Sequence, residues 1–365
     1  MKRNTTIDFF RGLFLLIMMV DHLQLFAFES INDLLKYTHE SFGYISAAEG
    51  FIFISGLMTG LVYCKKFDLE ESMGKNSLKS RIFQIYKMHF FTITIIAFFF
   101  IFPDFVNNWD ISWENKLSLW KDNPQRAWIT SALFLYHTSF VDVLPLYVLL
   151  MCAAYFVIPF LLKEKHKSVF ILSILLWIFG QFKPQEALGN HIGFLLGWFE
   201  VLSWQLLFLS GIYFGNLYFK DKLPKANDIL FFTSLAIAFT FFTTKQILGL
   251  SLPTGLVNVR TLGIFRLINF FSLLYIFYYL YIKKFFRPSF SIINVLGRNS
   301  LNVFAVHLVI VYISGSLKPF LQNTNSLNQY LLFFICIFGL YIPIIYEKIK
   351  KIFSTRKISM VKSQV

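Results

Sequence analysis

Ten apolar stretches determine what this chain can fold into. Most of them reach the length of about 17–25 residues that a helix needs to cross the hydrocarbon core of a membrane. Backbone N–H and C=O groups inside that core must find partners within the segment, which favours helices. The sequence therefore predicts an all-α fold, a polytopic membrane helix bundle with about ten transmembrane helices. The stretches lie near residues 9–28, 44–64, 88–105, 143–162, 168–184, 199–219, 228–243, 263–283, 299–316 and 328–347.

The composition is that of a chain whose surface faces lipid. Hydrophobic residues make up 56% of the 365 residues, and charged residues make up only 15%. A soluble domain of this size carries about 25% charged residues. The fifth and seventh stretches are shorter than the others, and each of them is open to being tilted or broken.

The positive charge of the chain indicates its orientation in the membrane. The formal net charge is +14, and most Lys and Arg residues fall in inner segments if the N-terminus is inside. This pattern places both termini in the cytoplasm. It argues against a nucleic-acid partner and makes membrane lipid the expected one. We expect residues 1–350 to form a single membrane-embedded domain and residues 351–365 to form a basic cytoplasmic tail.

The longest segment predicted to lie outside, residues 106–142, contains several tryptophans of the kind found at membrane interfaces. Its apolar run at 129–137 is too short to cross a membrane, so we expect a re-entrant or surface-lying helix there. Three histidines predicted near the outer side are candidates for contact with an acceptor. They are His39, His137 and His191.

No sequence pattern indicates a metal or a permanently bound cofactor. Cys64, Cys152 and Cys336 stand far apart, and we expect them to be packing residues. No group of His, Cys, Asp and Glu has the spacing of metal ligands, and no nucleophile elbow or Walker sequence is present.

The first stretch carries the most informative polar residues. Arg11 and His22 are separated by about three turns, so both lie on one face of a helix, roughly 16 Å apart along its axis. This geometry suits a coenzyme A thioester, whose phosphates a cation could hold while an imidazole deeper in the protein meets the thioester. Histidine can accept a proton from a hydroxyl near neutral pH. Alternatively, Arg11 contacts anionic lipid and His22 forms a hydrogen bond within the bundle.

Four further residues are candidates for the site. Glu49 lies at a depth comparable to that of His22 and could orient its imidazole; alternatively, it pairs with another buried cation. His307 lies near the middle of the ninth stretch, where a histidine could also be a packing residue. Arg81 and Arg266 could contact the donor, although Arg81 is equally placed as a membrane anchor.

The chain also resembles a known family. Arginine, ten residues and then histidine in the first helix mark acyltransferase family 3, and Arg11 and His22 fit this pattern. His307 matches a late-helix histidine pattern of the same family. The chain resembles an OpgC-type membrane acyltransferase, a branch of that family, over most of its length. The blocks that carry this resemblance are IDFFRG (7–12), FGYISAAEGFIFISGLMTGLVY (42–63), VDVLPLYVLL (141–150), SWQLLFLSG (203–211), RLINFFSLLY (266–275) and LGRNSLNVF (296–304).

The resemblance implies an acyl-CoA-dependent acyltransferase of the bacterial inner membrane that O-acylates extracytoplasmic glycans. OpgC-type proteins are associated with succinylation of periplasmic glucans. The resemblance makes His22 the catalytic residue and Arg11 its partner. The wider family often has two arginines three apart before the third helix, where this sequence has Leu78 and Arg81. Donor-phosphate binding there would depend on Arg81.

Several features of the reaction stay open at this point. The acyl group could be succinyl or acetyl, and transfer could be direct or could pass through an acyl-histidine. A transporter or flippase for a glycan or lipid-linked intermediate could use the same buried charges. A structural scaffold is a third alternative, which the shared face of Arg11 and His22 disfavours.

Overall fold

A computed structural model of the chain describes residues 3–26, 28, 35–101, 119–120, 122–138, 140–193, 196–316, 318, 321 and 324–362. The regular secondary structure of these residues is helical, in agreement with the predicted all-α fold. The chain divides into two compact units. The first comprises Met1–Asn32 and Pro288–Val365, and the second comprises Asp33–Arg287.

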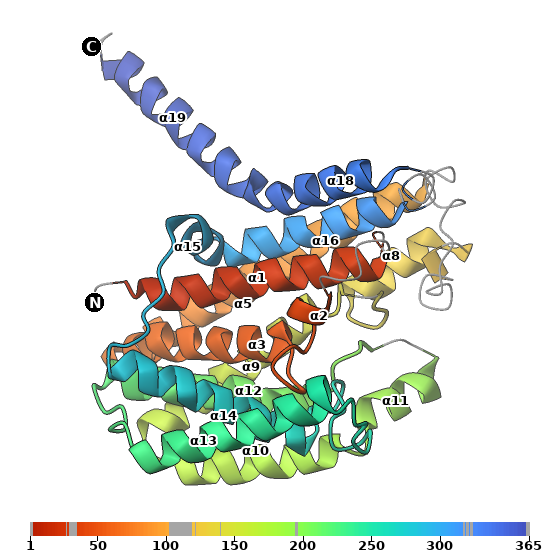
Figure 1. Cartoon of the computed structure of the whole chain (residues 1–365). Coiled ribbons are helices and arrows are strands. Elements are labelled where there is room, and N and C mark those ends of the chain that lie inside the picture. Colours follow the sequence, from red (N-terminus) through yellow and green to blue (C-terminus); the bar gives the residue numbers. More distant parts are fainter. Residues whose placement is uncertain are drawn as a thin grey trace. The chain divides into compact units, whose positions relative to one another are not determined.

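The first unit is built from the two ends of the chain. Helix α1 lies beside α16, and α15 crosses α1 near its beginning (Figure 1). A short 3-10 turn, Gly339–Tyr341, joins the last two helices. The helices of this unit are α1 (Thr5–Phe26), α15 (Ser291–Arg298), α16 (Ser300–Ser316), α18 (Ser326–Phe338) and α19 (Ile342–Lys362).

Two glycines allow α15 to approach the backbone of α1. A Cβ atom at Gly12 would fall on the carbonyl oxygen of Ile293, and one at Gly297 would fall on that of Asp8. Helices α15 and α16 then meet at an angle of 91°. Because of this crossing and bend, the IDFFRG and LGRNS blocks, from opposite ends of the sequence, come into contact.

The second unit is organised around α12. Residues 203–212 of this helix are all buried, so it contacts other helices on nearly every side. The helices of this unit are α2 (Leu35–Thr38), α3 (Ala47–Thr59), α4 (Lys65–Leu69), α5 (Glu71–Ile101), α8 (Pro124–Ala132), α9 (Val143–Leu162), α10 (His166–Gly180), α11 (Pro184–Ile192), α12 (Val201–Phe219), α13 (Asp228–Phe242) and α14 (Ile264–Ile282), with π-helical turns at Gly60–Cys64 and Thr243–Ile247.

Helices α3 and α12 approach each other through paired glycines. Gly56 and Gly60 on one side, and Gly211 and Gly215 on the other, lie against backbone carbonyls of the partner helix. A Cβ atom at any of the four would fall on a carbonyl oxygen. Both pairs have the G-x-x-x-G spacing that brings membrane helices into close contact. The glycines at 56 and 60 are therefore packing residues.

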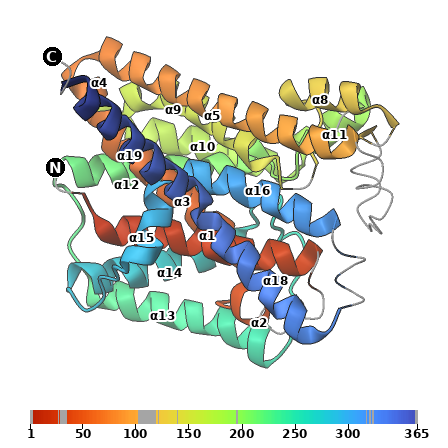
Figure 2. The ribbon, with the colours of Figure 1, turned by 90° about the horizontal axis from the view of Figure 1, so that it is seen from above.

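Helix α8 folds back along α5 (Figure 2). Tyr86 Oη of α5 donates to the carbonyl of Ala132 at 3.4 Å, and Trp128 Nε1 of α8 donates to Thr94 Oγ1 at 3.1 Å. These pairs show that the two helices run in opposite directions. The helix predicted at 129–137 therefore lies five residues earlier in the chain, at Pro124–Ala132. It begins where the Asn123 side chain accepts a hydrogen bond from Arg126 N.

Each of the ten apolar stretches overlaps a helix, but in the described residues five helical segments are long and apolar enough to cross a membrane. Two further crossings are possible if each of two bent helix pairs counts as one span: α10 with α11, bent by 52°, and α15 with α16, bent by 91°. The fifth stretch is thus broken, as its shortness suggested. Ten spans and cytoplasmic termini stay predictions. The five helical segments that are long and apolar enough to cross are Ala47–Leu69, Val143–Leu162, Asp228–Ile247, Ile264–Ile282 and Ser326–Ile352.

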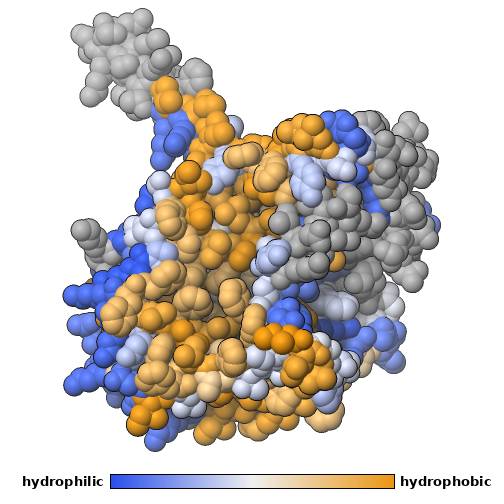
Figure 3. Space-filling model, in the orientation of Figure 1, coloured by the Kyte–Doolittle hydropathy of each residue, from blue (hydrophilic) through white to orange (hydrophobic). Residues whose placement is uncertain are grey.

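The surface carries large apolar side chains where a bilayer would contact it. On α13, Ile229 is 79% exposed and Phe232 is 65% exposed. Figure 3 shows mostly hydrophobic surface over α13 in its lower half, with hydrophilic residues gathered toward the left edge.

Near the C-terminus, α19 continues to Lys362. The predicted tail at 351–365 therefore begins inside a helix.

Candidate functional site

Helices α1 and α16 bring the predicted site residues of the first unit together. Arg11 donates a hydrogen bond to Ser300 Oγ. Eleven residues further along α1, His22 Nδ1 lies 3.0 Å from Nε2 of His307, and the two rings stack with centroids 4.8 Å apart. Arg11 and His22 thus share one face of α1, as predicted, and this face contacts α16. The order of the two contacts shows that the helices run in the same direction.

His307 is fully buried. Phe304 packs edge-on against its ring at a centroid distance of 5.5 Å. The second ring nitrogen of His307, Nδ1, has no hydrogen-bond partner in the described part of the chain. A buried polar atom without a partner requires an explanation, and a bound ligand is one. His307 therefore forms the buried half of an imidazole pair with His22, which is half-buried.

A second polar cluster lies near the beginning of α1. The buried carboxylate of Asp8 accepts two hydrogen bonds from Arg3, at 2.6 and 2.9 Å. Arg298, which ends α15, lies 3.4 Å from the same carboxylate. Both arginines are about half exposed, at 56% and 45%. With Arg11 nearby, this cluster has more positive than negative charge.

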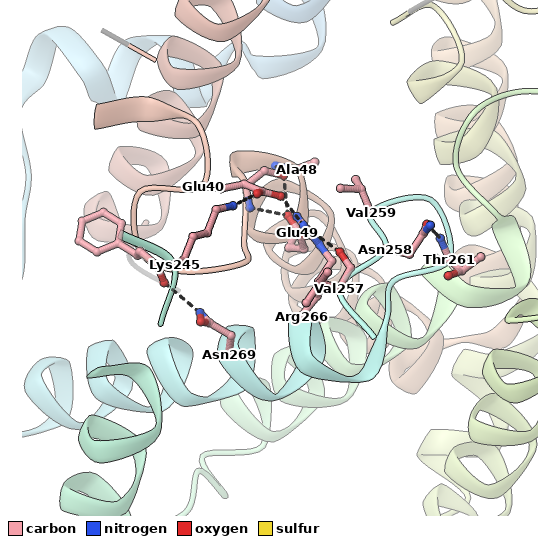
Figure 4. A network of polar contacts seen from close by, with 12 residues as sticks. Glu40, Ala48, Glu49, Lys245, Val257, Asn258, Val259, Thr261, Arg266 and Asn269 are labelled. Atoms are coloured by element: carbon pink, nitrogen blue, oxygen red, sulfur yellow. Dashed lines mark hydrogen bonds and ion pairs between the residues drawn. The ribbon is translucent and has the colours of Figure 1, made fainter. Parts of the chain in front are cut away.

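The second unit contains a buried ion-pair network (Figure 4). Arg266 of α14 is 1% exposed, and its Nε and Nη2 atoms lie 2.7 and 2.5 Å from Glu49 Oε1. The other Glu49 oxygen accepts from the backbone N–H and the hydroxyl of Ser46, at 2.9 and 2.6 Å. Ser46 and Glu49 thereby form the capping box that begins α3. Glu49 is a partner for a buried cation, one of the two roles that the sequence left open.

Glu40 extends this network to a third segment. Its carboxylate pairs with both Arg266 and Lys245, the latter from the π-helical turn after α13. Asn269 Nδ2 donates to the carbonyl of Phe42 at 3.0 Å. Figure 4 shows these side chains converging on the segment that leads into α3. Two carboxylates and two cations compensate each other here, so the network fastens the segment to α14.

Two further polar residues lie on α5: the predicted Arg81, and His89. Arg81 lies on α5 and donates to the Gln84 side chain at 2.8 Å. His89 is buried, and its Nε2 lies 3.0 Å from the carbonyl of Ser131, so Nε2 carries the hydrogen. A role of Glu49 in orienting His22 would join the two units and stays a prediction. In the described residues, no three His, Cys, Asp or Glu side chains form a group that could hold a metal.

Arg298, Ser300 and Glu40 are residues of these clusters that the sequence did not single out. Arg298 and Ser300 lie in the LGRNSLNVF block, which carried only the family resemblance. Nothing in the sequence near Glu40 distinguishes it from a solvated loop residue. By contrast, the S-x-x-E spacing of Ser46 and Glu49 was a readable signal for the beginning of a helix.

Comparison with known proteins assigns the chain to a family. A family model described as "OpgC protein" matches residues 3–351. The chain belongs to the OpgC family. The match spans both compact units, from Arg3 before α1 to Lys351 within α19. Searches of curated proteins and of solved structures gave no match. The OpgC resemblance noted in the sequence blocks is thus confirmed over nearly the whole chain, in a helical membrane protein with several candidate spans.

Proposed function

We propose that this OpgC-family protein is an O-acyltransferase that moves an acyl group from cytosolic acyl-CoA to a hydroxyl of an extracytoplasmic glycan. The His22–His307 pair is the observation that carries the proposal. Membership of the OpgC family supports acyl transfer as the reaction class. We place the protein in the bacterial inner membrane as part of this proposal, which the family membership and the positive-inside charge pattern support.

In this mechanism His22 acts as the general base. If Nδ1 of His22 carries the hydrogen and donates to His307 Nε2, then Nε2 of His22 is the basic nitrogen. His307 holds the ring in this tautomer, in the way a third group orients the histidine of a catalytic triad. His307 then carries its own hydrogen on Nδ1, which has no protein partner in the described residues. An acceptor atom of a bound substrate would satisfy it.

The transfer step is a direct acyl exchange. His22 accepts the proton of the glycan hydroxyl while the hydroxyl oxygen attacks the thioester carbonyl. The new C–O bond forms, the C–S bond breaks, and the proton passes from His22 to the departing thiolate. No covalent enzyme intermediate is required. Proton transfer of this kind typically contributes about 10²–10⁴-fold to a rate.

The donor phosphates are proposed to bind at the Arg11 end of α1. Arg3 and Arg298 contact Asp8 there, and Arg11, three residues after Asp8 on α1, donates to Ser300. Arginine suits this role because its guanidinium can contact phosphate oxygens in pairs. This end lies roughly 16 Å along α1 from His22, a separation that the pantetheine arm would bridge. The two ends of the donor thus match the two polar ends of the α1–α16 contact.

Arg81 and Arg266 stay predictions as donor contacts. Arg81 lies on α5, where its described hydrogen-bond partner is Gln84. Arg266 already pairs with Glu49 and Glu40, so a donor carboxylate or phosphate would have to displace one of them. For this reason the proposed mechanism uses neither residue.

Transfer of labelled acyl groups to glycan by the purified protein in lipid nanodiscs tests the proposal. His22→Ala should reduce transfer at least 10²-fold, and His307→Gln should reduce it less. His166, the first residue of α10, gives the matched control, His166→Ala, which should retain full transfer. Unfolding temperatures should stay close to that of the unaltered protein. Undiminished turnover in His22→Ala would remove His22 from this role.

A transporter or flippase is distinguished by its response to the donor. Ligand that binds only the folded state stabilises it by about 2.7 kcal/mol at a hundredfold excess over Kd. The acyltransferase proposal therefore predicts a higher unfolding temperature with coenzyme A. A transporter for a glycan should show no such shift.

A further inference from the structure

A cavity of about 160 Å³ lies in the second unit, between the α8–α9 connection and the segment that leads from α11 into α12. Its wall includes Phe134, His137 and Asp142 from the first of these, and Gly197 and Phe199 from the second. Both segments are predicted to lie outside the membrane. The cavity thus belongs to the side from which an acceptor would arrive.

The α11–α12 segment is held in a fixed shape at the cavity. Gln185 Nε2 donates to the carbonyls of Leu196 and Phe199, at 2.6 and 3.1 Å, and its Oε1 accepts from Val201 N at 3.1 Å. Gly197 has φ +101°, in the left-handed region that disfavours other residues. These bonds use the whole amide of Gln185, so its role is to shape the wall.

A carboxylate and an imidazole meet at one side of the cavity. Asp142 is 5% exposed and His137 is 4% exposed. A Cβ atom placed on Gly197 would lie 3.4 Å from Asp142 Cβ and 3.6 Å from His137 Nδ1. Asp142 Oδ2 also accepts from Trp198 N at 2.7 Å. The glycine therefore leaves room beside both side chains, and the bond to Trp198 fixes the carboxylate.

Phe134 forms an aromatic part of the wall in a conformation that costs energy. Its φ is +62°, in the left-handed region, directly after the end of α8. Glycine is the usual residue at this position of a helix end, because a side chain is strained there. A bulky residue held in such a conformation points to a functional demand for its ring. Phe134 also packs against His89 and His137, with ring centroids 5.2 and 6.3 Å apart.

The size and charge of the cavity restrict its ligand. An engineered protein cavity of about 150 Å³ holds one benzene molecule, so this one has room for a six-membered ring. Among the described residues, no Lys or Arg lines the cavity, and the carboxylate of Asp142 would repel phosphate or a succinyl carboxylate. Aromatic walls with a few fixed polar groups suit a neutral ligand that has both an apolar face and hydroxyl groups.

We propose that this cavity binds one sugar ring of the acceptor glycan. Asp142 and His137 form hydrogen bonds with its hydroxyl groups, and Phe134 and Phe199 cover its C–H face. This inference rests on the proposed function, because it names the place where the acceptor of that reaction is recognised. It adds a binding site in the second unit to the polar site of the first.

Oligosaccharide binding to the full chain in lipid nanodiscs tests the proposal, with a linear glucose pentasaccharide as the probe and coenzyme A measured separately. Asp142→Asn keeps an oxygen for Trp198 N–H but removes the charge, and Phe134→Leu removes the aromatic ring. Each should raise the Kd for the pentasaccharide at least tenfold and change that for coenzyme A less than twofold. Phe182→Leu is the matched control, since Phe182 is 77% exposed and outside the cavity.

Unchanged pentasaccharide binding in both variants would overturn the proposal, and so would a protein that binds coenzyme A but no pentasaccharide. If Asp142→Asn does not fold, Phe134→Leu decides alone. The two proposals can fail separately. A protein that binds the pentasaccharide through these residues but neither binds coenzyme A nor transfers acyl groups would keep this site and lose the proposed function.

Discussion

Single charged side chains in this protein are distinguished by the partners that packing gives them. His22 and Arg11 both contact α16, whereas Glu49 and Arg266 compensate each other inside the second unit. Arg11 contacts a hydroxyl and His22 contacts an imidazole, and neither of these partners neutralises a charge as an ion pair does. The second two form an ion pair, whose main effect is on stability. Residues of similar appearance in the sequence therefore differ in expected function.

Replacement of Glu49 by Gln should destabilise the protein. The amide keeps an oxygen for Ser46, but it leaves the buried guanidinium of Arg266 with only Glu40 as a carboxylate partner. Removal of one partner from a buried ion pair typically costs about 3–5 kcal/mol. The unfolding temperature in detergent should fall clearly for Glu49→Gln and almost not at all for Glu70→Gln, a substitution of an exposed residue. Equal stability of the two variants would contradict a structural role for the network.

Replacement of Arg298 by Ala should weaken donor binding. Arg298 is 45% exposed and lies 3.4 Å from Asp8, so it can turn toward a phosphate while Asp8 keeps its two hydrogen bonds from Arg3. We expect KM for acyl-CoA to rise roughly tenfold, about 1.4 kcal/mol, with kcat nearly unchanged. Arg287→Ala, outside this cluster, is the control. A fall in kcat with unchanged KM would place Arg298 at the chemical step instead.

At the scale of elements, close helix contacts in both units depend on glycine. The α1–α15 contact uses Gly12 and Gly297, and the α3–α12 contact uses two glycines from each helix. Small residues allow such approach, and within a bilayer packing replaces the hydrophobic effect as the main source of helix association. These contacts fix which faces of α1 and α3 are turned inward.

Gly211→Ala should disrupt the contact between α3 and α12, because its methyl group would collide with the carbonyl oxygen of Phe53. Neither backbone can move without shifting a whole helix, and overpacking of this kind typically costs about 1–3 kcal/mol. The same substitution at Gly255 is the matched control, because an added Cβ atom there would meet no described atom within 4 Å apart from those of its chain neighbours. The unfolding temperature should fall for Gly211→Ala only. Similar unfolding temperatures for both variants would show that α3 and α12 can move apart without loss of stability.

At the scale of the whole molecule, the charge pattern predicts which connections face the cytoplasm. Ser72 lies in a segment predicted inside, and Asn190 lies in one predicted outside; both are exposed. In a variant without native cysteines, Asn190→Cys should react with a membrane-impermeant maleimide added to intact cells. Ser72→Cys should react only after the membrane is opened. The reverse pattern would invert the orientation, and labelling of both residues in intact cells would contradict the predicted topology.

The helical membrane fold, the family and the shared face of Arg11 and His22 can be predicted from the sequence alone. These follow from apolar length, from motif spacing and from helical periodicity, all of which are local properties of the chain. Three features become visible only in the folded chain: His307 is the partner of His22, Arg266 pairs with Glu49 and Glu40, and a cavity opens beside Asp142. These contacts join residues far apart in the chain. They depend on how glycine contacts and helix bends set one element against another, which the periodicity of a single segment does not encode.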